Sequence, residues 1–309
     1  MTSKSKIDEL KGIISERLKR LIDRDFWLFD VPHYTNIGDA LIWQGELDFL
    51  SSLPYKCKGM RSYYTPVPTN IGEDDLILLH GGGNFGDIYY EPHAYKMQVM
   101  QKYPHNKIIL LPQTVWFEHE ENVRKCAEIM SKCTDLTLCA RDKVSYDFMK
   151  QHFGGTVLLL PDMAFCIDTS KWHPQPASKG NLLLKRIDVE LKETKVLKGL
   201  EESSDMTVCD WPTFAENSWQ KNWLRRTRKY VPALYDWYAQ YVFLPYLVNS
   251  GVTLISSHDK IYSTRLHAAI MSILLGKEKD LTWFDNSYGK NFNFYDAWLK
   301  DVDGITFVK

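Results

Sequence analysis

The chain has 309 residues, of which 44% are hydrophobic and 25% are charged, and its formal net charge is −1. This composition is typical of a globular protein long enough for two domains, and it lacks the basic excess of a nucleic-acid-binding protein. Neither a run of about 18 apolar residues nor the apolar leader of a secreted protein is present, so we expect a cytoplasmic protein without a membrane-spanning helix.

The predicted elements of the first half begin with a helix over residues 6–22, where apolar residues recur every three or four positions. Apolar runs then alternate with helical stretches. The predicted strands cover 26–31, 76–80, 107–112, 136–140 and 156–161, and the predicted helices cover 39–50, 91–102, 119–131 and 142–152. This alternation predicts a parallel sheet with helices on both faces, which binds its ligands at the carboxyl ends of the strands.

Residues 168–181 are rich in proline, serine and lysine and predict a linker between two domains. A second α/β set follows. Its predicted strands cover 181–186, 206–211, 252–257 and 281–285, and its predicted helices cover 217–249 and 264–276. We therefore predict an α/β protein with two Rossmann-like, doubly wound domains, residues 1–170 and 171–309, that face each other across a cleft.

The strongest local motif is Arg265-Leu266-His267, which follows the predicted strand 252–257 and opens the predicted helix 264–276. A helix N-terminus attracts anions, and an arginine adds a planar fork for carboxylate or phosphate. A histidine beside it can transfer a proton near neutral pH. The same pattern also fits an arginine that caps a neighbouring loop and a histidine that is hydrogen-bonded in the core.

The glycine-rich residues 80–87 follow the predicted strand 76–80 and satisfy the spacing of a dinucleotide-binding loop. Two features argue against a dinucleotide. Pro92 predicts a helix that starts too late to reach a pyrophosphate, and the strand 107–112 does not end in an acidic ribose ligand. An esterase is excluded because the G-x-S-x-G nucleophile motif is absent. The glycines then serve either close approach of the backbone to a ligand or a tight turn.

Six motifs in chain order resemble those of the polysaccharide pyruvyltransferase family. They occupy residues 36–39, 80–87, 111–114, 140–145, 184–190 and 261–270. The resemblance, which runs from about residue 30 to 295, implies two Rossmann-like domains arranged as in GT-B glycosyltransferases. It also implies phosphoenolpyruvate as the donor substrate and, as acceptor, a sugar of an exopolysaccharide or of its lipid-linked precursor, which would become a pyruvate ketal.

The resemblance also assigns roles to individual residues. The C-terminal domain would bind phosphoenolpyruvate through Arg265, Leu266 and His267, with His267 as the general acid that protonates the methylene carbon. Because this donor carries about three negative charges, further cations are needed, and the candidates are Arg186, Arg141 and Lys290. The N-terminal domain would hold the acceptor, with Asp39 or Asp87 as general base. The other candidates on the acceptor side are Asn36, Gly38, Gly82, Gly83 and Asn84, although asparagine and aspartate also serve in turns and caps.

No metal-binding or P-loop spacing occurs, so we expect no metal site, no bound cofactor and no nucleic-acid partner. A basic and aromatic helical segment, residues 219–230, could approach anionic lipid head groups at the inner face of the membrane, although it also fits a solvated helix face. Two alternatives remain at this stage. A nucleotide-sugar glycosyltransferase of the GT-B type would share the cleft, and a non-catalytic sugar-binding protein would not need the Arg265 and His267 pair.

Overall fold

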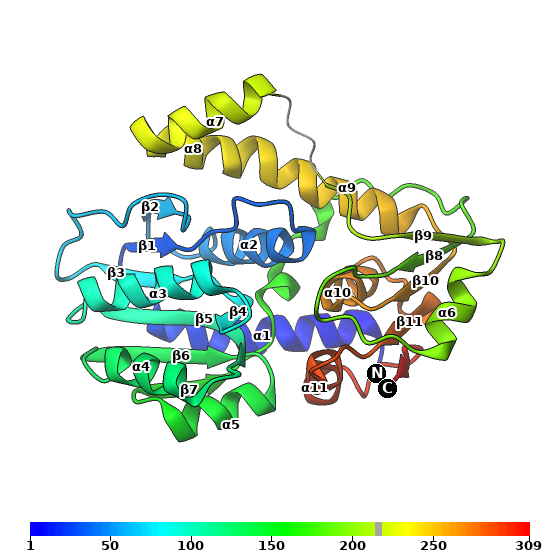
Figure 1. The fold of residues 1–309 in the computed structure, drawn as a ribbon, viewed down its shortest axis with the longest axis horizontal. Helices are drawn as coiled ribbons and strands as arrows, with labels where there is room; N and C mark the ends of the chain where they lie inside the picture. The colour runs from blue at the N-terminus through cyan, green and yellow to red at the C-terminus, as the bar shows by residue number, and fades with distance from the viewer. Residues whose placement is uncertain (214–217) are drawn as a thin grey trace.

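The structure is a computed structural model that describes residues 1–213 and 218–309. In this part of the chain, two β-sheets lie side by side and helices pack against them (Figure 1). The first sheet has seven described strands and the second has five, and their pairings are parallel. The predicted α/β class with two parallel sheets is therefore confirmed, whereas a GT-B relation between the two halves stays a prediction.

The first sheet comes from the N-terminal half and has the order β2-β1-β3-β5-β6-β7, with β4 paired to β5. Its strands are β1 (Phe26–Phe29), β2 (Cys57–Arg61), β3 (Leu76–Leu79), β4 (Gly82–Gly86), β5 (Lys107–Trp116), β6 (Asp135–Ala140) and β7 (Thr156–Leu159). Its helices are α2 (Ile37–Leu50), α3 (Tyr90–Lys102), α4 (Glu120–Met130) and α5 (Lys143–His152). The five predicted strands are all present. The sequence does not predict β2 and β4, because β2 lacks a continuous apolar run and β4 is rich in glycine.

The second sheet has the order β12-β11-β10-β8-β9. Its strands are β8 (Asn181–Leu184), β9 (Met206–Cys209), β10 (Lys260–Ser263), β11 (Leu281–Phe284) and β12 (Thr306–Val308). Helices α6 (Lys195–Glu201), α10 (Leu266–Leu274) and α11 (Lys290–Trp298) belong to this half, and the short turns η1 (Met163–Cys166) and η2 (Thr169–Lys171) lead into it. The predicted strands 181–186, 206–211 and 281–285 correspond to β8, β9 and β11.

The predicted strand 252–257 is wrong. These residues form the end of helix α9 (Leu244–Ser256) and a turn, and the strand that precedes the Arg265 motif is β10. Val252 and Ile255 are buried in the core where α9 packs against α2 and α10. A short apolar run is found both in buried strands and in helices that other elements cover. Its periodicity therefore does not distinguish a strand from a helix.

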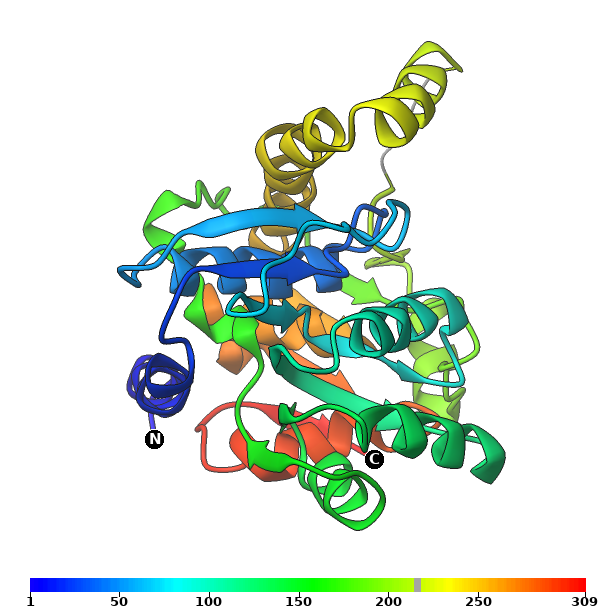
Figure 2. The ribbon, with the colours of Figure 1, turned by 90° about the vertical axis from the view of Figure 1, so that its left-hand side faces the viewer.

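The predicted helical region 217–249 is divided into several pieces. It contains α7 (Ser218–Tyr230), α8 (Pro232–Tyr238), the π-helical turn η3 (Ala239–Phe243) and the start of α9. The division between α7 and α8 falls at Pro232, which stands in the first turn of α8 where it needs no hydrogen-bond donor. Figures 1 and 2 show α7 and α8 standing out from the body of the molecule. The predicted basic face of this region lies partly outside the described residues, since the side chains of 218–222 and 225 are not described.

Helix α1 (Ser3–Leu21) spans both halves and lies behind them in the view of Figure 1. Its residues Leu10, Ile14 and Leu18 are fully buried in a core that also contains residues of both sheets. At its start, Lys6 forms an ion pair of 2.9 Å with Asp301, close to the C-terminus. The two halves therefore share a continuous core, and the boundary between residues 170 and 171 stays a prediction. Across the described residues, no helix combines the length and the apolar character that a membrane span requires.

Candidate active site

A cavity of about 440 Å³ opens between the carboxyl ends of the two sheets. Its walls come from segments that follow β1, β2, β6, β8, β9, β10 and β11, together with β4 and the loop after it. The lining residues that carry charge are Asp39, Glu91, Arg141, Arg186, Asp188, Glu190, Asp210, Arg265, His267 and Lys290. The cavity thus lies where the parallel topology predicts a ligand site, and charged groups from both halves of the chain line it.

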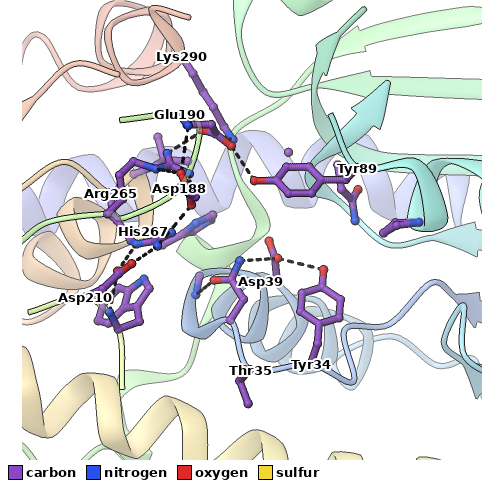
Figure 3. Close-up of a pocket in the computed structure, with 18 of the residues that line it drawn as sticks. Tyr34, Thr35, Asp39, Tyr89, Asp188, Glu190, Asp210, Arg265, His267 and Lys290 are labelled. Carbon is purple, nitrogen blue, oxygen red and sulfur yellow. Dashed lines mark hydrogen bonds and ion pairs between the residues drawn. The ribbon is translucent and has the colours of Figure 1, made fainter. Parts of the chain in front are cut away.

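Arg265 stands at the N-cap of α10, as the sequence predicts for the start of this helix. Its Nε and Nη2 atoms donate to the two carboxylate oxygens of Asp210, both at 2.5 Å. Nη2 also lies 3.5 Å from Asp188 (Figure 3). The planar fork of Arg265 is therefore already engaged by a carboxylate, and its positive charge is balanced within the protein. Asp210 follows β9, and nothing in its local sequence marked it as a site residue.

Arg186 lines the cavity, whereas its neighbour Lys185 points elsewhere and pairs with Glu193 and Glu201. The Arg186 guanidinium is bonded to Asp188 at 2.7 Å and to Glu190 at 2.7 Å. The Arg-x-Asp-x-Glu motif of the sequence is therefore a local ion-pair network of one cation with two carboxylates. It positions Arg186 at the cavity and neutralises it there.

Glu190 is a point of contact between the two halves. Besides Arg186, it accepts a hydrogen bond of 3.0 Å from the Tyr89 hydroxyl of the first half and lies 3.5 Å from Lys290 Nζ (Figure 3). Burial would raise the pKa of Glu190, but Lys290 and Arg186 hold it at about 2. Burial and the Glu190 charge raise the pKa of Tyr89, so its hydroxyl remains a donor. Tyr89 was not predicted from the sequence.

Arg141 and Lys290 are each paired with one carboxylate among the described residues, whereas Arg186 and Arg265 are each paired with two. Arg141 is fully buried and donates from Nη1 to Asp162 at 2.6 Å and from Nε to Thr114 at 2.9 Å. Its Nη2 atom has no hydrogen-bond partner among the described residues. A Cβ on Gly83 would lie 2.9 Å from this Nη2 and would collide with Lys290 Nζ. The two cations therefore converge on Gly83, where only glycine leaves room beside them.

The pKa of Lys290 is lowered by burial; Glu190 opposes this shift and the Arg141 charge adds to it. An anion placed between Lys290 and Arg141 would favour the charged form of Lys290 and would pair with the free Nη2 of Arg141. This part of the cavity can therefore accept negative charge.

His267 occupies the first turn of α10, and its side chain is 10% exposed. Its Nε2 atom lies 3.4 Å from Asp162 Oδ2. On the other side of the ring, the Cβ that alanine would add at Gly38 lies 2.7 Å from Nδ1. Gly38 thus leaves the ring the space it needs at the start of α2. His267 is thus buried and hydrogen-bonded to Asp162, and its ring also lines the cavity.

Asp39 and Asn36 lie together at the start of α2. Asn36 is the N-cap, because its Oδ1 accepts from the Gly38 backbone at 2.9 Å, and its Nδ2 donates to Asp39 at 2.8 Å. The Tyr34 hydroxyl also donates to Asp39, at 3.0 Å (Figure 3). Asp39 lines the cavity and is held there by two donors, so its carboxylate can accept a proton or a hydrogen bond from a ligand in the cavity.

Asp87, the other candidate base, does not line the cavity. Its carboxylate accepts hydrogen bonds from the backbone of Glu118 at 2.8 Å and of His119 at 2.9 Å, and from Asn122 at 2.9 Å. It therefore fixes the turn that leads into α4. The prediction that Asp87 takes a substrate proton is corrected on this ground, since all its oxygens are used in holding that turn.

The glycine-rich residues 80–87 are a strand and its flanking turns rather than a loop. Gly82 has a φ of +122° and is not a lining residue, so its conformation explains the need for glycine. Asn84 lines the cavity, and its side-chain oxygen accepts a hydrogen bond of 2.9 Å from Nζ of the buried Lys96. Among these glycines, Gly83 alone combines a place in the cavity wall with a close approach to the cations.

Besides Tyr89, three aromatic residues of the wall were not predicted: Tyr34, Tyr63 and Trp211. Aromatic rings present apolar faces and polar edges, which suit the faces and hydroxyls of a sugar ring. Their positions directly after β1, β2 and β9 are a signal that could have been used, although β2 itself was not recognised. Among the described residues there is no group of three or more acidic, histidine or cysteine side chains able to hold a metal ion.

Comparison with known proteins decides the family. Residues 36–278 match the model of the family described as polysaccharide pyruvyl transferase. The chain belongs to the polysaccharide pyruvyl transferase family. It is thus an enzyme that transfers pyruvyl groups, and the predicted resemblance is confirmed.

Two named relatives span most of the chain. A Bacillus subtilis protein with a provisional pyruvyl transferase name, EpsO, is 29% identical over all of this chain and 96% of its own. Pyruvyl transferase 1 of Schizosaccharomyces pombe is 25% identical over 91% of this chain and 72% of its own. The fold is also that of a crystal structure of an uncharacterised protein of Klebsiella pneumoniae, with a TM-score of 0.64 and 20% identity over 97% of this chain and 98% of the other.

Proposed function

We propose that this enzyme transfers the pyruvyl group of phosphoenolpyruvate to a sugar of an exopolysaccharide, or of its lipid-linked precursor, and closes a pyruvate ketal. One observation carries the proposal. The buried Arg141 has an unpaired Nη2 that converges with Lys290 on the open face of Gly83, within a cavity that also contains His267. A small anionic substrate matches this arrangement, because its oxygens can accept hydrogen bonds from the unpaired Nη2 of Arg141 and from Lys290.

The donor would be divided between two groups of cations. Arg265 and Arg186 are each paired with carboxylates of Asp210, Asp188 and Glu190, so they offer donors of reduced net charge. Among the described residues, Arg141 pairs with one carboxylate, that of Asp162, and Lys290 with one, Glu190 Oε2 at 3.5 Å from Nζ, and the Nη2 atom of Arg141 has no partner. We therefore assign one anionic group of phosphoenolpyruvate to Arg141 and Lys290, and the other to the start of α10 at Arg265, Leu266 and His267, where free backbone N–H groups add to the attraction.

The chemistry requires one proton to be delivered and two to be removed. His267 donates a proton to the methylene carbon, which becomes a methyl group and leaves the adjacent carbon electrophilic. A sugar hydroxyl forms the first C–O bond to that carbon and loses its proton to Asp39. A second hydroxyl of the same sugar then forms the second C–O bond while the bond to phosphate breaks. Inorganic phosphate carries away the proton of the second hydroxyl, and the proton taken by Asp39 returns through solvent to His267, so that atoms and charge balance and the enzyme is regenerated.

The acceptor would lie against the first half of the chain. Asp39 stands at the start of α2, Tyr34 and Tyr63 also line the cavity from this half, and Trp211 lines it from the second half. A lipid-linked acceptor would bring the enzyme to the inner face of the membrane. The exposed Trp237 of α8 and Tyr241 of the adjoining turn η3 are side chains that favour such an interface, so peripheral membrane association belongs to this proposal.

A donor comparison tests the proposal. Release of phosphate from phosphoenolpyruvate should depend on enzyme and on a hexopyranoside acceptor, such as a panel of p-nitrophenyl hexopyranosides. Release of nucleotide from sugar nucleotides should not occur with the same acceptors. Nucleotide release without phosphate release would replace the proposal with a nucleotide-sugar glycosyltransferase of the GT-B type.

A further inference from the structure

Asp162 lies directly after β7, where it caps the turn η1, and it is completely buried. One of its oxygens, Oδ1, accepts from the backbone of Ala164 at 2.9 Å. The other oxygen, Oδ2, accepts from Arg141 Nη1 at 2.6 Å and lies 3.4 Å from His267 Nε2. A single carboxylate oxygen therefore contacts two groups of the cavity, one from each half of the chain.

Asp162 does not itself line the cavity. It can influence a bound substrate only through Arg141 and His267, which do line it. An ionised carboxylate accepts hydrogen bonds and cannot donate them, so a ring nitrogen that faces it must carry a hydrogen. Although burial would raise the pKa of Asp162, the charges of His267 and Arg141 lower it, which agrees with an ionised carboxylate.

We propose that Asp162 is a positioning residue that keeps a proton on His267 Nε2 and thereby makes Nδ1 the atom that exchanges protons with the substrate. The inference rests on the proposed function for its catalytic consequence, but not for the proton position itself. The ring lines the cavity, and Nδ1 is the nitrogen that Asp162 does not contact; it faces Gly38, where an added Cβ would lie 2.7 Å away and only glycine leaves room. The same carboxylate fixes Arg141, and the free Nη2 of Arg141 is thereby aimed at the space beside Gly83.

This arrangement couples donor binding to the orientation of the acid. Arg141 and His267 are 126 residues apart in the sequence. The same oxygen of Asp162, Oδ2, contacts both side chains. If the two halves were to separate slightly, the contact between Asp162 and His267 would lengthen and the ion pair between Asp162 and Arg141 would not, because Asp162 and Arg141 both belong to the first half.

The first test needs no substitution at Asp162. Long-range nitrogen–proton correlation spectra of histidine-labelled enzyme distinguish the two neutral tautomers, and the His267 signals are assigned by their loss in His267→Gln. In the absence of substrate, neutral His267 should carry its proton on Nε2. A proton found on Nδ1 overturns the proposal, whether or not the enzyme accepts phosphoenolpyruvate.

The second test is Asp162→Asn, which keeps the size of the side chain but places an amide where the acceptor oxygen stood. We expect the Nε2 tautomer to lose its dominance, kcat for phosphate release to fall by about 10²-fold or more, and the dissociation constant of phosphoenolpyruvate measured by calorimetry to rise by less than about tenfold. A purely structural role would not move the tautomer or separate kcat from binding. A folded Asp162→Asn protein with an unchanged tautomer and wild-type kcat overturns the proposal.

Asp75→Asn is the matched control. Asp75 is also a buried carboxylate that accepts from a backbone N–H, that of Gly72 at 3.0 Å, from a ring N–H, that of Trp27 at 3.1 Å, and from a cation, Lys58. It lies at the amino end of β3, far from the cavity wall. Its substitution should lower stability and leave kcat, donor affinity and the His267 tautomer unchanged. Absence of turnover in the wild type with phosphoenolpyruvate would instead count against the proposed function, while the tautomer would still decide the role of Asp162.

Discussion

Gly83→Ala tests the place where we put the donor's negative charge. The added methyl carbon would lie 2.9 Å from Arg141 Nη2 and would collide with Lys290 Nζ. Lys290 ends in a flexible chain and can move, but Arg141 is fixed by Asp162 and Thr114 and cannot. The methyl group therefore occupies the space into which both cations direct their free N–H bonds.

We expect this variant to fold, with a loss of stability of about 1–3 kcal/mol from overpacking. Phosphoenolpyruvate affinity should fall by at least about tenfold, which corresponds to about 1.4 kcal/mol of binding free energy. At a concentration of 100 times the wild-type dissociation constant, the donor stabilises the wild type by about 2.7 kcal/mol, and about half of this should be lost. The shift in melting temperature caused by the donor should shrink accordingly, by roughly 2–4 °C.

The measurements are calorimetric titration with phosphoenolpyruvate and thermal unfolding with and without it. Gly12→Ala is the control, because Gly12 is exposed within α1 and a Cβ there meets nothing within 4 Å. It should raise stability by about 0.4–1 kcal/mol and leave donor affinity unchanged. If Gly83→Ala binds phosphoenolpyruvate as tightly as the wild type, the donor does not lie between Arg141 and Lys290, and the reasoning is refuted.

Three other substitutions test separate parts of the structure. Arg265→Lys keeps a charge but loses the fork that Asp210 engages, so calorimetry should show donor affinity reduced well beyond a few-fold; an unchanged affinity would remove Arg265 from the donor site. Asp87→Ala should cost about 1–3 kcal/mol of unfolding free energy by denaturant titration and leave kcat unchanged, whereas a loss of kcat in the folded variant would return Asp87 to the list of bases. Burial raises the pKa of Asp236 to about 7 against the opposing charge of Arg61, so wild-type stability should fall as pH rises from about 4 to about 7. Asp236→Asn should abolish this decline, worth up to about 4 kcal/mol; a variant that loses more stability at pH 7.5 than at pH 5 would show that the ion pair with Arg61 dominates instead.

The sign of the last effect follows from proton binding. The folded state holds the Asp236 proton up to a higher pH than the unfolded state does. Between the two pKa values, the folded protein therefore binds more protons, and raising the pH favours unfolding. Below both values the carboxyl is protonated in each state and contributes no pH dependence.

The sequence by itself determined the α/β class, the parallel sheets and the family. Each depends on local patterns, namely apolar runs of strand length, helical stretches between them, and short motifs such as Arg265-Leu266-His267 at a helix start. The expectation that ligands bind at the carboxyl ends of the strands also needed no coordinates, because it follows from parallel topology. The predicted strands whose ends lie at the cavity are β1, β6 and β8, whereas β10 was not predicted.

Only the tertiary structure decided which candidates meet and which are already paired. Asp39 and Asp87 both follow a glycine close to a strand end, yet one lines the cavity and the other holds the turn before α4. The partners of the key cations are distant in sequence, since Arg265 binds Asp210, 55 residues away, and His267 faces Asp162, 105 residues away. Charge pairing acts over a few ångströms in space, and sequence patterns report only on neighbours along the chain. The same reason explains residues 252–257, which end helix α9 and whose apolar side chains are covered by helices distant in sequence, α2 and α10.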